Sequence, residues 1–121
     1  MSISEAESVV MDVLWKSHPA TAEDVVVALA GRADWQDVTI RTMLNRLLKK
    51  GAITAQRDGR RYLYRPLVKR TDYMHAESKT LLDRLFEGRL VPMVAHFSAH
   101  QKLSKKEIAE LKRLVEKLDH E

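Results

Sequence analysis

Cysteine is absent from this chain of 121 residues, which excludes disulfide bonds, thiol catalysis and cysteine-ligated metal. The sequence also lacks any run of about 18 apolar residues, so we expect no membrane insertion. The first five residues show no basic patch followed by an apolar stretch, and no signal peptide is expected. These absences predict a cytoplasmic protein.

Sequence patterns of enzyme sites are lacking as well. There is no glycine-rich phosphate loop, no nucleophile elbow and no Ser/His/Asp pattern, so we expect neither catalysis nor a cofactor. His96 and His100 stand four positions apart and could touch one metal ion on a helix. No third ligand is evident nearby, and exposed or structural histidines are the favoured interpretation.

Acidic residues are nearly missing from the middle of the chain. Residues 39–70 carry ten Lys or Arg and one acidic residue, whereas residues 1–38 carry two basic and seven acidic residues. Residues 71–121 balance nine against nine, so the excess behind the net charge of +4 lies in the central block. A concentrated cationic surface attracts phosphates, which supply most of the non-specific affinity for double-stranded DNA.

Three helices are predicted before and within this block. Capping boxes, a hydroxyl residue followed three positions later by an acidic one, mark the starts of helices over 5–16 and from about 22 to Gly31. Residues Gly31 to Asp34 should form a turn. A third helix is expected over 37–50, with Trp35 and Ile40 at the positions of a hydrophobic staple and Gly51 as C-terminal cap.

The third helix divides cleanly into two arcs at 100° per residue. Ile40, Met43, Leu44, Leu47 and Leu48 share the apolar arc, and the other arc is polar. Polar side chains in the first turns of such a helix reach base edges in the DNA major groove. The predicted base-contacting residues are Val38, Thr39, Arg41, Thr42 and Arg46. For the apolar Val38, contact with a thymine methyl group and partial cover by Trp35 are equal alternatives.

After Gly51 the period changes to the alternation of strands. Asp58-Gly59 is a hairpin turn signal, and Tyr62 and Tyr64 share one face of the returning strand, which Pro66 ends. Three helices and a basic hairpin are typical of a winged helix-turn-helix. Charges at the helix end and in the hairpin suit phosphates, where geometry is loose, and the predicted DNA-backbone contacts are Lys49, Lys50, Arg57, Arg60 and Arg61.

The rest of the chain is predicted to be helical, with a capping box at Ser104 and a heptad-like seam in the last helix. Its apolar stripes have no obvious partner within one chain, so two copies burying each other is the economical solution. The predicted dimerisation residues are Met74, Leu81, Leu85, Phe86, Val94, Phe97, Ile108, Leu111, Val115 and Leu118.

The predicted fold class is therefore mainly α with a small β-hairpin. An N-terminal winged helix-turn-helix DNA-binding domain should occupy residues 1–68, and a C-terminal three-helix dimerisation domain residues 69–121.

Four segments carry a family resemblance: SEAESVVMDVLW (4–15), DWQDVTIRTMLNRLLKKGAI (34–53), RDGRRYLYRPLV (57–68) and LSKKEIAELKRLVEKL (103–118). Together they resemble the BlaI/MecI penicillinase repressors in register over nearly the whole chain. The resemblance implies a homodimeric repressor that occludes a promoter at a near-palindromic operator. It places family DNA contacts on Val38, Thr39, Arg41, Thr42 and Arg46.

The resemblance also implies a route of release. In those repressors a β-lactam signal, received by a membrane-bound sensor with a zinc protease domain, leads to cleavage before a phenylalanine in the dimerisation region. The matching pair in this chain is His96-Phe97.

Two other functions suit the same fold. The dimer interface could bind a small aromatic or drug-like effector, which thermal shift with candidate effectors would reveal. The winged helix could instead be a protein–protein interaction module, in which case binding to a duplex would show no steep salt dependence.

Overall fold

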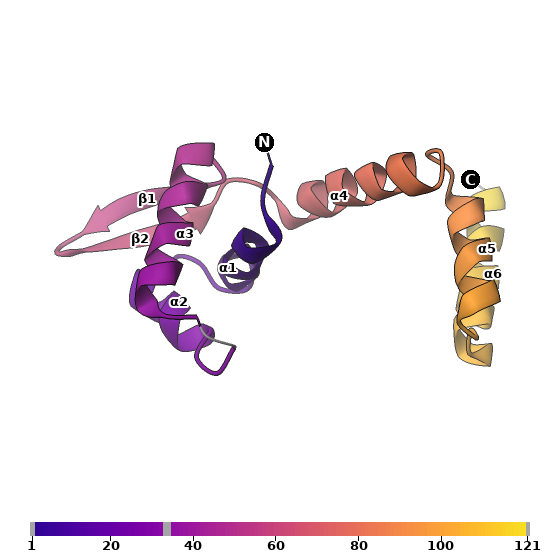
Figure 1. Cartoon of the computed structure of the whole chain (residues 1–121), viewed down its shortest axis with the longest axis horizontal. Helices are drawn as coiled ribbons and strands as arrows, with labels where there is room; N and C mark the ends of the chain where they lie inside the picture. Colours follow the sequence, from indigo (N-terminus) through magenta and orange to yellow (C-terminus); the bar gives the residue numbers. More distant parts are fainter. Residues whose placement is uncertain (1, 33–34, 121) are drawn as a thin grey trace. The chain divides into compact units, whose positions relative to one another are not determined.

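The computed structural model describes residues 2–32 and 35–120. Helices α1 (Glu5–Lys16), α2 (Ala22–Ala28) and α3 (Asp37–Lys50) precede the strands β1 (Ile53–Asp58) and β2 (Arg61–Pro66). Helices α4 (Arg70–Leu85), α5 (Leu90–His100) and α6 (Lys105–Asp119) follow (Figure 1). This order confirms the predicted fold class, a winged helix-turn-helix followed by three helices. Half of the predicted turn, Ala33 and Asp34, lies outside the described residues.

Capping side chains begin the helices where the sequence predicted. In α1, Ser4 Oγ accepts a hydrogen bond from the Glu7 amide, and the Glu7 carboxylate accepts one from the Ser4 amide. Thr21 and Asp24 form the same reciprocal pair at α2. At α6 the structure records the first half of the box, in which Ser104 Oγ accepts from the Glu107 amide. These bonds satisfy amide donors that the first helical turn leaves free.

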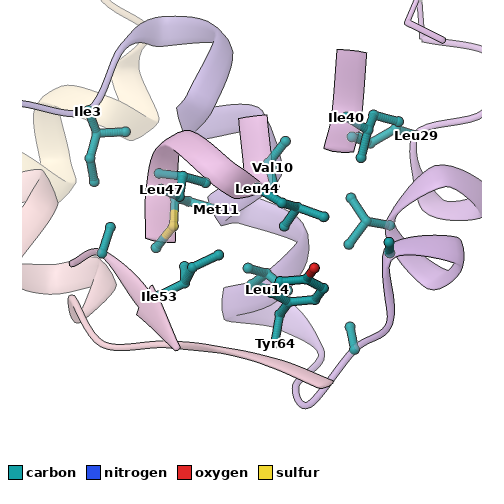
Figure 2. Close-up of a cluster of buried hydrophobic side chains, with 14 residues drawn as sticks. Ile3, Val10, Met11, Leu14, Leu29, Ile40, Leu44, Leu47, Ile53 and Tyr64 are labelled. Atoms are coloured by element: carbon teal, nitrogen blue, oxygen red, sulfur yellow. The ribbon is translucent and has the colours of Figure 1, made fainter. Parts of the chain in front are cut away.

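The N-terminal core is built from one side each of α1 and α3, with contributions from α2 and the hairpin (Figure 2). Helix α3 supplies Ile40, Leu44 and Leu47, each no more than 1% exposed. Helix α1 supplies Val10, Met11 and Leu14, which are fully buried against them. Because Ile40, Leu44 and Leu47 lie on one side of α3, their burial sets the rotation of the helix and leaves its polar arc facing out.

The hairpin is antiparallel, and its register pairs Ile53 with Pro66 and Asp58 with Arg61. The turn is therefore Gly59-Arg60, one residue later than the predicted Asp58-Gly59. Gly59 has a φ of 65°, which suits a glycine at the first loop position of a tight hairpin. Tyr64 also exchanges backbone hydrogen bonds of 2.8 and 3.1 Å with Ala20, which joins the wing to the segment before α2.

Two compact units divide the chain between Met74 and His75, inside α4, and the predicted domain boundary after residue 68 lies just before this helix. The first turn of α4 belongs with the N-terminal unit because Tyr73 packs on Trp15, whose Nε1 donates to the Val68 carbonyl over 2.8 Å. In the second unit, none of the described residues of α4, α5 and α6 is buried. No helix in the described part of the chain is long and apolar enough to span a lipid bilayer.

An ion pair between the buried Glu7 and the partly exposed Lys50 joins the start of α1 to the end of α3. The Glu7 side chain is 2% exposed, and Lys50 Nζ donates to its Oε1 and to the Ser2 carbonyl oxygen. Burial by itself would raise the pKa of Glu7. Hydrogen bonds from Lys50 and Ser4 outweigh it, so the pKa lies below its ordinary value and the carboxylate is charged at neutral pH.

Replacing Lys50 with Met should lower the free energy of unfolding by about 1–3 kcal/mol, because the buried Glu7 carboxylate loses its cation. The matched control is Lys49→Met, at the exposed neighbouring position, which should change stability by less than about 0.5 kcal/mol. Urea denaturation at pH 7 measures both. Equal losses in the two variants would contradict a structural role for the pair.

The loss of stability caused by Lys50→Met should depend on pH. Because the folded-state pKa of Glu7 is lowered, its stabilisation is fully present above the unfolded-state pKa and is lost as pH falls through the folded-state pKa. The difference in stability between wild type and Lys50→Met should therefore shrink below about pH 4.

Candidate nucleic-acid interface

The outward arc of α3 presents a row of side chains opposite the buried Ile40, Leu44 and Leu47. At 100° per residue, its centre is formed by Val38, Thr42, Asn45 and Lys49, all of which are exposed. Val38 is 71% exposed, so cover by Trp35 does not account for an apolar side chain at this position. An exposed helix face with short side chains at Val38, Thr42 and Asn45 and a cation at Lys49 is of the kind that a major groove accepts.

Arg46 and Lys49 carry the exposed charges of this arc that have no partner in the described part of the chain. Both are exposed, and neither has a hydrogen-bond or ion-pair partner within residues 2–32 and 35–120. Thr42 Oγ1 donates to the Val38 carbonyl over 2.9 Å, which leaves its methyl group and lone pairs facing outward. Thr39 is only partly exposed, at the edge of the arc.

Arg41, on the opposite edge, is held by two carboxylates. Its Nη2 donates to Glu23 Oε1 of α2 over 2.7 Å, and its Nε donates to Asp37 Oδ1 over 3.1 Å. The hydrogen bond that Arg41 donates to Glu23 lowers the pKa of the Glu23 carboxyl and raises the pKa of Arg41. Both shifts stabilise the charged forms of Glu23 and Arg41. A base-reading role was predicted for Arg41, but its partner Glu23 stands 18 positions away on α2 and leaves no pattern in the sequence.

Lys50 lies apart from the other predicted phosphate-binding residues. Its ammonium group donates to the buried Glu7 carboxylate and to the Ser2 carbonyl, so its charge is matched by Glu7. Helical geometry explains the difference from Lys49: one residue further along, 100° of rotation turns the side chain from the centre of the outward arc towards α1.

The wing brings Arg60 and Arg61 to the same hollow as Arg41. Arg57 Nε donates to the Gly59 carbonyl over 3.1 Å, and Arg61 pairs with Asp58 at 3.2 Å, so both are oriented by the turn. Arg60 has no partner in the described part of the chain. A hollow of about 110 Å³ joins wing and helices, and its lining includes Glu23, Arg41, Arg60, Arg61, Tyr62 and Tyr64. Figure 1 shows the hairpin extending beside α3.

Two residues that the sequence analysis did not choose belong to this surface. Asn45 lies at the centre of the outward arc, and its amide could donate to and accept from a base edge. The helical wheel already placed it among polar residues, so the signal was present. Glu23 could not have been found in this way, because it stands 18 positions from Arg41 on another helix.

In the second unit, the predicted dimerisation residues form exposed apolar surfaces. Phe97, Ile108, Leu111, Val115 and Leu118 are 37–58% exposed, and Val94 and Phe86 are partly buried. An apolar groove lies between α5 and α6, lined by Leu90, Val91, Val94, Ala95, Leu111 and Val115. The His96-Phe97 peptide lies within α5, with both side chains exposed.

His96 and His100 do not gather further ligand groups around them. Their rings stack at 4.5 Å, and His96 also contacts the rings of Phe86 and Phe97. His100 Nδ1 lies 3.0 Å from the His96 carbonyl oxygen. No group of three or more potential metal ligands occurs in the described residues.

Comparison with known proteins finds a family and relatives that match nearly the whole chain. The sequence model of the penicillinase repressor family matches residues 3–117. The chain is 39% identical to the penicillinase repressor of Bacillus licheniformis over 114 residues, covering 94% of this chain and 89% of that protein. It is 33% identical to the methicillin resistance regulatory protein MecI of Staphylococcus aureus over 115 residues, covering 95% and 94%.

A solved structure matches the N-terminal part. The solution structure of the monomeric form of BlaI from Bacillus licheniformis, in complex with the blaP half-operator, superimposes with a TM-score of 0.53 at 40% identity. The match covers 60% of this chain and 89% of that one.

Proposed function

The chain belongs to the penicillinase repressor family, and from this premise we propose that it binds a near-palindromic operator as a homodimer and occludes a promoter. It is a DNA-binding transcriptional repressor of the BlaI/MecI type and not an enzyme. The observation that carries the finer proposal is the outward arc of α3, open to solvent and flanked by the wing arginines. We assign the protein to the cytoplasm, where its operator would be.

We assign roles within the interface by geometry. Val38, Thr39, Thr42 and Arg46 read base edges together with Arg41, and Asn45 joins them from the centre of the arc. Lys49, Arg57, Arg60 and Arg61 contact phosphates. We leave Lys50 out of the phosphate set because its charge is matched by Glu7.

Replacing Arg46 with Ala should weaken operator binding by about 1–3 kcal/mol and relax the base preference at one position of each half-site. Lys49→Ala is the matched variant one helical turn away. It should weaken all duplexes alike and reduce the slope of log affinity against log salt by about one unit. Gel shifts over a salt series, with a duplex selected from a random pool and a scrambled duplex, measure both. An Arg46→Ala protein that keeps its preference would remove Arg46 from the base-reading set.

The dimer proposal is supported by the second unit, in which no described residue of α4, α5 or α6 is buried. Apolar side chains exposed in this number cost free energy in water, and a second copy offers the same stripes for mutual burial. The effector alternative draws on these same side chains, and no separate observation favours it. In a dimer, two recognition helices about 34 Å apart read half-sites one helical turn apart.

Leu111→Glu should therefore raise the dimer dissociation constant by at least about a hundredfold, because the charge would be buried unpaired in the interface. Glu110→Ala, at the neighbouring exposed position of α6, is the control and should leave the dimer intact. Analytical ultracentrifugation gives both constants, and far-UV circular dichroism checks the fold. A wild-type chain that stays monomeric at micromolar concentration would overturn the dimer.

Release by proteolysis is proposed on the family relationship, with a membrane-bound sensor protease as the partner and the His96-Phe97 peptide as the site. The exposure of both side chains supports access, and their position inside α5 requires the helix to unwind locally before the backbone can be cleaved. Mass spectrometry of the chain recovered from its own cells after β-lactam exposure should find a fragment that ends at His96. Recovery of the intact chain alone, with the regulated gene induced, would contradict this route.

A further inference from the structure

We propose that Glu23 is a positioning residue for sequence recognition: its carboxylate, with that of Asp37, orients the guanidinium of Arg41 so that its remaining edge faces a base. This inference rests on the proposed function, since it takes α3 to enter the major groove. Glu23 itself lies on α2 and acts through Arg41.

The two hydrogen bonds of Arg41 occupy one side of its planar guanidinium. Nε donates to Asp37 and Nη2 donates to Glu23, at 3.1 and 2.7 Å. Nη1 has no partner within residues 2–32 and 35–120, and Nη2 keeps a second N–H group. The free Nη1/Nη2 edge is the pair of parallel donors that a guanine presents acceptors for at O6 and N7. With Nε and Nη2 fixed at two points on two helices, the plane of the group is fixed as well.

The charges around Arg41 favour base reading over phosphate binding. Two carboxylates flank Arg41, so its positive charge is balanced and offers little net attraction to a phosphate. Glu23 is the one carboxylate in the lining of the hollow that also holds Arg60 and Arg61. A negative charge among arginines that face DNA weakens non-specific attraction. Such an arrangement favours discrimination between sequences over affinity for any one of them.

An ordinary surface ion pair would explain the distance between Glu23 and Arg41. It would not explain why two carboxylates from two helices bond Nε and Nη2 of the same guanidinium. The side chains of Glu23 and Arg41 are 67% and 46% exposed, and exposed pairs of this kind contribute little to stability. Loss of Glu23 should therefore leave the fold intact and alter what Arg41 does. A merely structural role predicts a change in thermal stability without a change in base preference.

The experiment compares four full-length variants: Glu23→Gln, Asp37→Asn, Arg41→Ala and, as charge-matched control, Glu5→Gln in the first turn of α1. Each is put through selection from a random duplex pool, and its affinity is measured for the duplex selected by wild type and for a scrambled one. Thermal unfolding of each variant is recorded alongside.

Arg41→Ala should lose the preference at one base pair of each half-site, and Glu23→Gln should lose the preference at the same base pair. Discrimination between selected and scrambled duplex should fall about tenfold in both, as expected for one bidentate contact. In Glu23→Gln, affinity for the scrambled duplex should rise, because Arg41 becomes free for phosphates. Asp37→Asn should change the base preference at the same base pair, and Glu5→Gln should change the preference at none.

A Glu23→Gln protein with wild-type preference and discrimination would overturn the inference, as would a loss at positions that Arg41→Ala leaves unchanged. Should Glu23→Gln unfold, Asp37→Asn decides by the same readout. The proposed function fails separately: it is refuted when wild type itself selects no sequence from the pool, and it stands when wild type selects one and Glu23 proves irrelevant.

Discussion

Burial of Ile40, Leu44 and Leu47 is the constraint on which the rest of the structure depends. These three side chains pack α3 against α1 and the hairpin, and each is almost completely removed from water. A rotation of α3 by one residue would expose them and bury charges in their place, at a cost of several kcal/mol. The hydrophobic core of the first unit therefore decides which side chains α3 offers to a partner. Any recognition by α3 would use the face that this packing leaves exposed.

The cationic block does not act as one uniform charge. Lys50 is matched by Glu7 within the fold, Arg41 is matched by Glu23 and Asp37, and Arg61 is oriented by Asp58. The cations of the block without a carboxylate partner among the described residues are Arg46, Lys49, Arg57, Arg60, Arg65, Lys69 and Arg70. The net charge of the segment thus overstates the attraction to DNA. The acidic partners Glu7, Glu23, Asp37 and Asp58 therefore determine where unpaired positive charge is available.

Local rules recovered most of the fold. Ser4 with Glu7 and Thr21 with Asp24 fixed helix starts because capping depends on residues three positions apart, and Gly51 ended α3 as expected. The hairpin turn was placed one residue early, since its position depends on the pairing of Asp58 with Arg61 across the strands. At the candidate site, the helical wheel identified the outward residues. It could not identify their partners, because Glu7 lies 43 positions from Lys50 and Glu23 lies 18 from Arg41.

The three C-terminal helices, which bury none of their described residues within one chain, have a consequence for dosage. On the proposed assembly, the amount of active repressor follows mass action. At chain levels below the dimer dissociation constant, halving the number of chains lowers the number of dimers about fourfold. The loss of a small fraction of the chains would then lower the number of operator-bound dimers by a larger fraction. If the exposed apolar side chains of the second unit are buried only in a dimer, the amount of active repressor would change more steeply than the amount of chain.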